Sequence, residues 1–175
     1  MKQTYRNRCI IATANGPQTL SIPVVHGDSQ RISDIGISDQ GKWRHLHWQA
    51  LQSAYGESAF FEYYEDDLRP FFIDCGPESP VHLHSLLDYT LAGTRLMCRL
   101  LDLDVDIRLT DTYLPPSDDN TNDFRYSIRP KNAPIDATFT PRPYYQVYRD
   151  RHGFLPNLSI LDLLFNEGPQ AVLYL

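Results

Sequence analysis

Two arginines near the start of the chain have the spacing to hold an anionic group together. Arg6 and Arg8 lie two residues apart, so on an extended strand both side chains point to one face, with Asn7 and Cys9 on the other. A guanidinium binds a phosphate or carboxylate through two parallel hydrogen bonds, although structural ion pairs with Asp or Glu are the alternative. We take Arg6, Asn7 and Arg8 as candidate substrate-binding residues. Cys9 could be an acyl-accepting nucleophile, but a buried, unreactive thiol is the favoured interpretation.

Four of the six histidines form two His-x-His pairs, at His45 and His47 and at His82 and His84. On a strand such a pair could bind one metal ion, but on a helix residues two apart point about 200° apart and cannot do so. No metal site is therefore expected. His47 lies at the edge of the apolar stripe of a predicted helix, where a half-buried imidazole could act as a catalytic base. A hydrogen-bonded core histidine is the alternative.

A second group of candidates lies in the C-terminal part of the chain. Tyr144, Tyr145 and Gln146 follow a proline-rich stretch, where exposed tyrosines can stack on bases or sugars; packing against a sheet is the alternative. Asn157 and Asn166 flank a predicted helix and have no evident structural role there. These five residues are therefore also candidates for substrate binding.

The acidic residues have simpler interpretations. The run Glu62–Asp67 could supply paired carboxylates for acid–base chemistry or a divalent cation, but a solvated helix face is favoured. Asp162 lies three residues after Ser159, which is the spacing of a helix capping box. Asp162 is therefore predicted to support the start of a helix.

Composition and missing motifs exclude several classes of protein. The chain has 16 Lys and Arg against 22 Asp and Glu, a net charge of −6, which argues against nucleic-acid binding through a basic face. No apolar stretch approaches the roughly 20 residues that span a bilayer. Three cysteines suit a reducing compartment, so a cytoplasmic location is expected. Dinucleotide, Walker, Cys-x-x-Cys and Gly-x-Ser-x-Gly motifs do not occur, and no cofactor is predicted.

The elements that position these residues begin with a β-hairpin. Residues 4–13 and 19–25 have strand patterns, and Asn15-Gly16 between them is a strong hairpin signal. Pro23 has no N–H to donate, so either the second strand lies at a sheet edge or Pro23 lies where no ladder hydrogen bond is needed. Residues 31–37 are predicted as a short third strand.

Three helices are predicted next. Apolar residues recur at helical spacing from Trp43 to Ala54, and a second helix over 58–69 must end near Arg69-Pro70. The third and longest helix follows Ser79-Pro80 and should be the central core helix. Its apolar stripe predicts nearly complete burial of four side chains, namely Leu86, Leu87, Leu91 and Cys98.

The remaining segments are shorter. In chain order they are predicted as a strand over 105–109, a surface loop over 115–123, a strand over 124–129, a proline-rich excursion over 130–143, an extended segment over 144–149, a helix after Ser159 and a strand over 171–175. The predicted fold class is α+β: an N-terminal antiparallel sheet packed against three helices, with a Pro-rich excursion and a short C-terminal helix and strand. No linker is evident, so residues 1–175 are expected to form a single domain.

Several stretches resemble the WbqC-like protein family: TYRNRC at 4–9, ANG and SIPV within 14–24, HWQALQSAYGESAFFEYYEDDL at 47–68, YYQVY at 144–148 and GFLPNLSILDLLFNEGP at 153–169. The resemblance covers most of the chain and is weaker over 74–143. It implies a role in the biosynthesis of bacterial surface polysaccharides such as O-antigen. Family members usually carry a further segment ahead of the first strand, whereas this sequence starts at Met1-Lys2, so either its start is misplaced or that segment is missing.

Two functions are consistent with the resemblance. The first is a transferase that places an acyl or aminoacyl group on the amine of a nucleotide-linked sugar. Arg6 and Arg8 would hold phosphate, His47 would be the base, and Tyr144 or Tyr145 would stack on the substrate; the partners would be a nucleotide sugar and an acyl donor. The alternative is a non-catalytic binding module that docks on a sugar-modifying enzyme through its aromatic surface.

Overall fold

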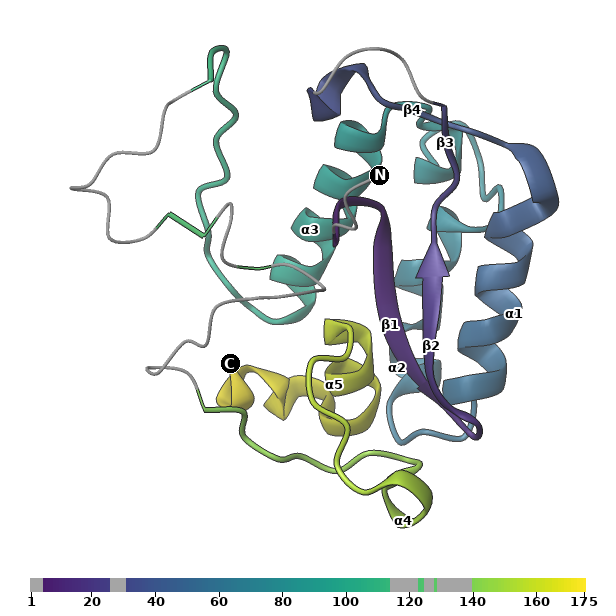
Figure 1. Ribbon diagram of the computed structural model, residues 1–175, viewed down its shortest axis with the longest axis vertical. Helices are drawn as coiled ribbons and strands as arrows, with labels where there is room; N and C mark the ends of the chain where they lie inside the picture. Colours follow the sequence, from purple (N-terminus) through teal and green to yellow (C-terminus); the bar gives the residue numbers. More distant parts are fainter. Residues whose placement is uncertain (1–4, 26–30, 114–122, 125–127, 129–139) are drawn as a thin grey trace.

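The computed structural model describes residues 5–25, 31–113, 123, 124, 128 and 140–175. Helices and strands are mixed within this part of the chain, and the strands form two small antiparallel sheets, so the predicted α+β class is confirmed. In Figure 1 the hairpin of β1 and β2 runs through the middle of the molecule, with α1 on one side, α3 on the other and α5 below.

The N-terminal hairpin is confirmed, with two corrections. Strand β1 (Arg8–Thr13) pairs antiparallel with β2 (Gly16–Ser21), from Arg8 opposite Ser21 to Thr13 opposite Gly16. The tight turn is therefore one residue earlier than predicted, and Gly16 enters β2 with a φ of +101°, which favours glycine. The predicted strand also starts too early, because Tyr5–Asn7 form a 3-10 turn.

Pro23 ends this pairing, and the chain passes into a second sheet. Strand β3 (Val24–Val25) pairs antiparallel with β4 (Gly36–Ile37). The strand predicted over 31–37 is thus mostly wrong, because Ile32–Asp34 form a 3-10 turn stabilised by a backbone hydrogen bond from Ile35 N to Ile32 O.

All three predicted helices are present. They are α1 (Trp43–Tyr55), α2 (Phe61–Leu68) and α3 (Leu86–Leu100). Helix α3 begins later than expected, because the Ser85 side chain accepts from Asp88 N and so caps it at that point. On α3 the buried residues are Leu86, Tyr89 and Leu96.

The predicted stripe on α3 is therefore only partly correct. Leu87, Leu91 and Cys98 are half-buried, not fully buried. The reason is that the helix packs through Tyr89, whose ring contacts the rings of Trp43 and Phe71. When tyrosine is counted as apolar, the buried face of the helix is rotated relative to the face that was predicted from the leucines alone.

The segments after α3 differ most from expectation. Residues 105–109 are irregular, with Val105 and Leu109 exposed, because no strand in the described residues pairs with them. The predictions for 115–123, 124–129 and most of 130–143 fall largely outside the described residues.

The C-terminal end is helical. Residues 144–148 form no strand and lead into α4 (Arg149–His152), and the predicted helix is α5 (Ile160–Glu167), with Ser159 as its N-cap. In place of the strand predicted over 171–175 is a 3-10 helix (Gly168–Tyr174). Gly168 makes this turn possible: its φ is +58°, and a Cβ there would lie 2.6 Å from the Phe60 ring.

The core is aromatic and joins the two ends of the chain. Trp48 stacks on Phe72, and the Phe165 ring of α5 lies 5.1 Å from Phe61 of α2 and 5.0 Å from Tyr55 of α1. Such ring pairs add to the burial of apolar area. No helix in the described segments has the length and hydrophobicity needed to cross a membrane.

Candidate functional site

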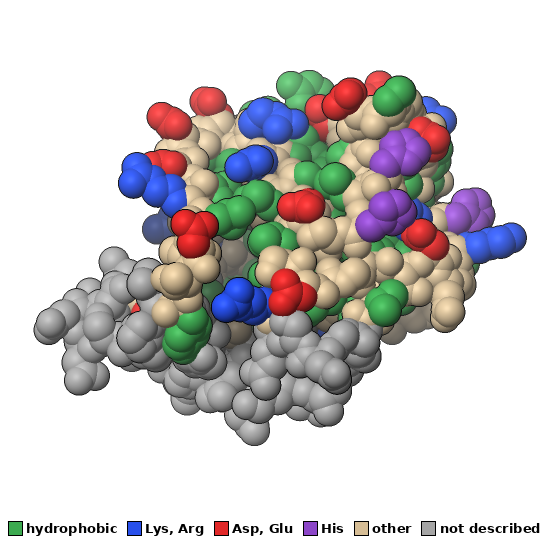
Figure 2. Space-filling model, turned by 90° about the horizontal axis from the view of Figure 1, so that it is seen from above, with side chains coloured by type: hydrophobic (Ala, Val, Ile, Leu, Met, Phe, Trp, Pro, Cys, Tyr) green, Lys and Arg blue, Asp and Glu red, His purple; other side chains and the backbone are tan. Residues whose placement is uncertain are grey.

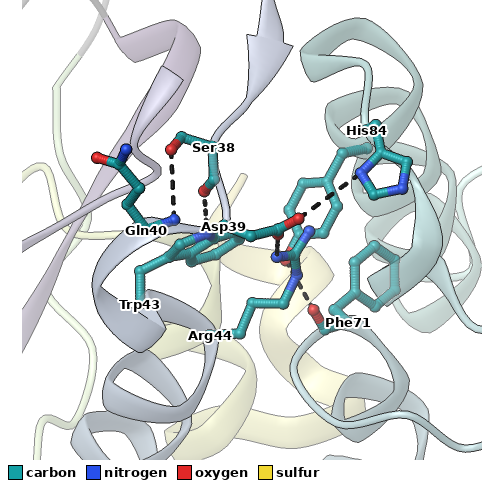
Figure 3. Close-up of polar contacts among 8 residues, drawn as sticks. Ser38, Asp39, Gln40, Trp43, Arg44, Phe71 and His84 are labelled. Atoms are coloured by element: carbon teal, nitrogen blue, oxygen red, sulfur yellow. Dashed lines mark hydrogen bonds and ion pairs between the residues drawn. The ribbon is translucent and has the colours of Figure 1, made fainter. Parts of the chain in front are cut away.

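Four ionisable side chains and one indole ring lie where α1 begins, and we call them the Arg44 site: Asp39, Trp43, Arg44, His47 and His84. Figure 3 shows how the turn before the helix supports it. Trp43 Nε1 donates to Ser38 O at 2.9 Å, and Gln40 N donates to Ser38 Oγ at 3.3 Å. These bonds hold the turn, and Asp39 with it, against the first turn of α1.

Arg44 is mostly buried although it is charged. Its side chain is 12% exposed, and the guanidinium carbon lies 4.5 Å from the centroid of the Trp43 ring. Nη1 donates to the Asp39 carboxylate. Nε and Nη2 are buried and have no hydrogen-bond acceptor among the residues that the structure describes. Arg44 therefore keeps two N–H-bearing nitrogens whose hydrogen-bonding capacity no described residue uses.

Asp39 links Arg44 to the segment before α3. Its side chain is 61% exposed, and its second carboxylate oxygen lies 3.9 Å from His84 Nδ1. Figure 3 shows Asp39 between Arg44 and His84. His84 is held in place through its backbone, since Ile37 N donates to His84 O at 2.7 Å. The cluster thus combines a buried cation with an exposed acid and an exposed imidazole.

His47 lies one helical turn beyond Trp43. Its ring meets the Trp43 ring edge-on at 5.1 Å, and the side chain is half-buried. Positions 43, 44 and 47 share one side of a helix, with 47 between the other two in angle. Burial lowers the pKa of His47 below 6.5, which favours the neutral imidazole that can accept a proton.

The arginines predicted to bind substrate do not share a strand face. Arg6 is exposed within the 3-10 turn, whereas Arg8 is half-buried at the start of β1. Arg8 Nε is buried and finds no acceptor in the described part of the chain. Asn7 has a structural role, since its side chain donates to Ile22 O at 2.9 Å and Ile22 N donates back to Asn7 O.

Three of the C-terminal candidates meet at a residue expected only to support a helix start. Asp162 is fully buried, and its carboxylate accepts from Tyr55 OH at 2.9 Å, Tyr144 OH at 2.7 Å and Gln146 Nε2 at 3.3 Å. Asn166 Nδ2 donates to Asp162 O at 2.7 Å. The prediction that Asp162 is a capping partner is therefore wrong. We call Tyr55, Tyr144, Gln146 and Asp162 the Asp162 network.

Burial dominates the electrostatics of this network. It raises the pKa of Asp162 above 3.8, although the three donors act in the opposite direction. It also raises the pKa of Tyr55 and Tyr144. Gln146 is 1% exposed and also exchanges two hydrogen bonds with the backbone of Leu155. The network joins α1, α5 and the segment before α4.

Two further candidates lie at the surface. Tyr145 is 58% exposed, and its backbone N donates to the Glu167 carboxylate at 2.9 Å. Asn157 has a φ of +61°, and its side chain donates to Tyr5 OH at 2.8 Å. Tyr145 thus presents its ring to solvent, while Asn157 ties the C-terminal segment to the start of the chain.

Cys9 fits the unreactive interpretation. Burial raises the pKa of its thiol to about 11, so the nucleophilic thiolate is disfavoured. Within the residues described, no group of three or more His, Cys, Asp or Glu side chains could hold a metal ion.

Sequence reasoning did not select Arg44 or Asp39 as site residues, and it weighed His84 only as part of a His-x-His pair. A signal was available for Arg44: in a helix it projects beside His47 and next to the buried Trp43, which is an unusual place for a cation. No sequence spacing pointed to the contact of Asp39 with His84, because it depends on how α1 packs against the segment before α3.

The protein thus has an α+β fold in which Arg44, an arginine with only part of its hydrogen bonds made, lies in the first turn of the first long helix. The model of the WbqC-like protein family matches residues 1–132, and the chain belongs to that family. It is 29% identical to "Uncharacterized protein Rv1507c" of Mycobacterium tuberculosis, over 99% of this chain and 82% of that protein. No solved structure matches.

Proposed function

We propose that the protein transfers an acyl or aminoacyl group to the amine of a nucleotide-linked sugar in the biosynthesis of bacterial surface polysaccharide. Membership of the WbqC-like family supports the pathway. The observation that carries the reaction is the position of His47, a half-buried imidazole one helical turn from the incompletely bonded Arg44. A base beside a cation suits a substrate with an amine and a phosphate.

The proposed step needs one proton acceptor and an activated acyl donor such as a thioester. The sugar amine attacks the acyl carbon, a C–N bond forms, and the bond from the acyl carbon to the donor sulfur breaks. The amine loses a proton, which His47 accepts at a ring nitrogen, and the thiolate leaves. Neutral His47 is the competent form, in agreement with the direction in which burial moves its pKa.

The remaining candidates have more distant roles. Arg44 takes over the phosphate contact expected of Arg6 and Arg8, because it lies on the same helix face as His47. Tyr145 is a candidate to stack on the base or sugar, since its ring is exposed. Tyr144, Gln146 and Asn166 act on the fold through Asp162 rather than on substrate.

The test begins with a thermal-shift screen of nucleotide sugars and acyl thioesters. A ligand at 100 times its Kd stabilises a protein by about 2.7 kcal/mol, which is a measurable shift. With a substrate pair in hand, His47→Gln should lower turnover about 10²–10⁴-fold with little change in melting temperature.

His45→Gln is the matched control, because His45 is an exposed histidine on the same helix and should keep full turnover. Unchanged turnover in His47→Gln, or loss of the fold, would show that His47 is a core histidine. The absence of any shift with nucleotide sugars would count against the function as a whole.

A second function is favoured by exposed apolar side chains. Val105, Leu109 and Tyr113 are each more than half exposed along the segment after α3, and so is Tyr145. Such surfaces often bind partner proteins. In this function the protein is a non-catalytic module that docks on a sugar-modifying enzyme. The double variant Leu109→Ser/Tyr113→Ser would then lose binding to that enzyme. His47→Gln would have no effect on the enzyme's turnover.

A further inference from the structure

We propose that Asp39 is a displaceable internal anion: its carboxylate holds the place on Arg44 that a diphosphate group of the substrate takes on binding. The proposal rests on the proposed function for the identity of the substrate, but not for the binding site itself. Three features of the Arg44 site support it, and they concern the arginine, the aspartate and the histidine in turn.

Arg44 can bind more acceptors than it has. Its Nη1 donates to Asp39, whereas Nε and Nη2 are buried without an acceptor among the described residues. A buried N–H without an acceptor is costly, so a ligand oxygen that reaches it gains the missing bond. Asp39 is held to one nitrogen only, and a diphosphate with several oxygens can satisfy more of the guanidinium edge.

Asp39 is suited to leave. Its side chain is 61% exposed, so its carboxylate regains water at little cost when it moves out. The second contact, to His84 at 3.9 Å, is long and involves a 75% exposed imidazole. By contrast, Arg44 is fixed between the Trp43 ring and the body of the protein. The exposed partner can therefore move while the buried partner stays.

The groups that face Asp39 favour a diphosphate over a single carboxylate. When Asp39 leaves, both the Arg44 guanidinium and the His84 imidazole face the space that it held. Two donors some distance apart fit two phosphate groups better than one planar carboxylate. Figure 2 shows histidine side chains gathered on one side of the upper face, next to acidic and basic side chains.

The experiment measures binding of uridine diphosphate and of inorganic pyrophosphate by titration calorimetry at fixed ionic strength, with acetate as the carboxylate probe. Asp39→Asn should bind both diphosphates about 5- to 10-fold more tightly than the wild type, because it removes a competing charge close to the ligand. Arg44→Gln should weaken binding at least about tenfold. Acetate should bind more weakly than pyrophosphate to every variant.

Two matched variants separate this effect from net charge. Asp74 forms a similar exposed pair with His82, at 3.1 Å, which is a pair with an imidazole and not with an arginine. Asp106 pairs with the exposed Arg108. Asp74→Asn and Asp106→Asn remove the same charge and should leave diphosphate affinity within about twofold of the wild type, because these aspartates lie in other exposed pairs.

An equal gain in Asp74→Asn or Asp106→Asn, or no gain in Asp39→Asn, would overturn the proposal. If Arg44→Gln fails to fold, Arg44→Lys gives the same test, because it keeps the charge but loses the parallel N–H donors of the guanidinium. Diphosphate binding that tightens in Asp39→Asn without any acyl transfer would keep this inference and reject the proposed reaction. Acyl transfer that depends on His47 but ignores Asp39 would do the reverse.

Discussion

The two ends of α1 both carry a carboxylate partner, yet they differ in how completely their polar groups are bonded. At the C-terminal end, Tyr55 OH donates to Asp162 and accepts from Ala12 N at 3.0 Å, and all of this is buried. At the N-terminal end, Arg44 has two nitrogens without an acceptor among the described residues, and its partner Asp39 is exposed.

The difference separates a structural role from a binding role. A buried polar network in which nearly every group is satisfied makes the packing of its elements specific and leaves little for a ligand; beside Asp162, only Asn166 Oδ1 is buried without a hydrogen-bond partner among the described residues. A network with unused donors next to a movable acid contributes less to the fold but can exchange one anion for another. We therefore assign the fold-holding contacts to the Tyr55 end of α1 and propose the Arg44 end as the place for ligand chemistry.

The largest effect on stability is expected at the Tyr55 end of α1, when the Asp162 network is broken. Asp162→Ala leaves the hydroxyl donors of Tyr55 and Tyr144 without this acceptor, while Gln146 Nε2 keeps its bond to Leu155 O. Each buried unpaired group costs about 1–3 kcal/mol, so we expect a loss of about 3–5 kcal/mol. Urea denaturation measures it. Asp150→Ala, at an exposed position of α4, is the control and should change stability by less than about 0.5 kcal/mol. A small loss in Asp162→Ala would show that the network is not structural.

Single hydroxyls in the network should rank by the number of bonds they make. Tyr55→Phe removes two hydrogen bonds, one of them to the β1 backbone, and should cost about 2 kcal/mol; Tyr144→Phe removes one and should cost about 1 kcal/mol. Thermal and urea unfolding test the order. Equal costs would mean that the bond from Ala12 to Tyr55 adds nothing.

The two ends should also respond to pH in opposite directions. The pKa of Asp162 is raised in the folded state, so above pH 3.8 the folded protein holds the extra proton and stability falls as pH rises, by at most about 1.4 kcal/mol per unit. The pKa of His47 is lowered, so stability falls as pH drops below 6.5. Asp162→Asn should remove the first slope and His47→Gln the second, in urea titrations across about pH 3–8. Persistence of either slope in its variant would assign it to another group.

The smallest effect on stability is expected at the Arg44 end of α1. Arg44→Met replaces a buried, partly bonded charge with an apolar side chain that can still cover Trp43, and should change the free energy of unfolding by less than about 1 kcal/mol. Chemical denaturation gives the value. A loss above about 3 kcal/mol would make Arg44 a structural residue and erase the contrast between the two ends.

Local patterns predicted the elements whose neighbours are close in sequence. The hairpin followed from β-prone residues on both sides of Asn15-Gly16, and α1 from apolar spacing between Trp43 and Ala54. The cap at Ser159 was also predictable, since the Ser159 side chain accepts from Leu161 N. Capping needs only residues within one turn.

Strand predictions failed where pairing needs a distant partner. Residues 105–109 alternate apolar and charged side chains as a half-buried strand does, yet in the described chain they pair with no other strand. Residues 171–175 are also rich in β-prone side chains, but Gly168 turns the chain into a 3-10 helix beside Phe60. A strand depends on another strand, and the sequence of one segment does not show whether it is there.

For the site, the sequence by itself determined that His47 lies at the edge of an apolar helix face and that Tyr144, Gln146 and Asn166 are unusual enough to matter. Only the tertiary structure decided that these three side chains form hydrogen bonds with Asp162. In the sequence Asp162 lies 16 residues from Gln146, 18 from Tyr144 and 107 from Tyr55, its third side-chain donor. It also decided that Asp39 lies between Arg44 of α1 and His84 of the segment before α3. Helical spacing is local, but which charges meet across elements depends on packing, because contacts between distant segments leave no periodic trace in the sequence.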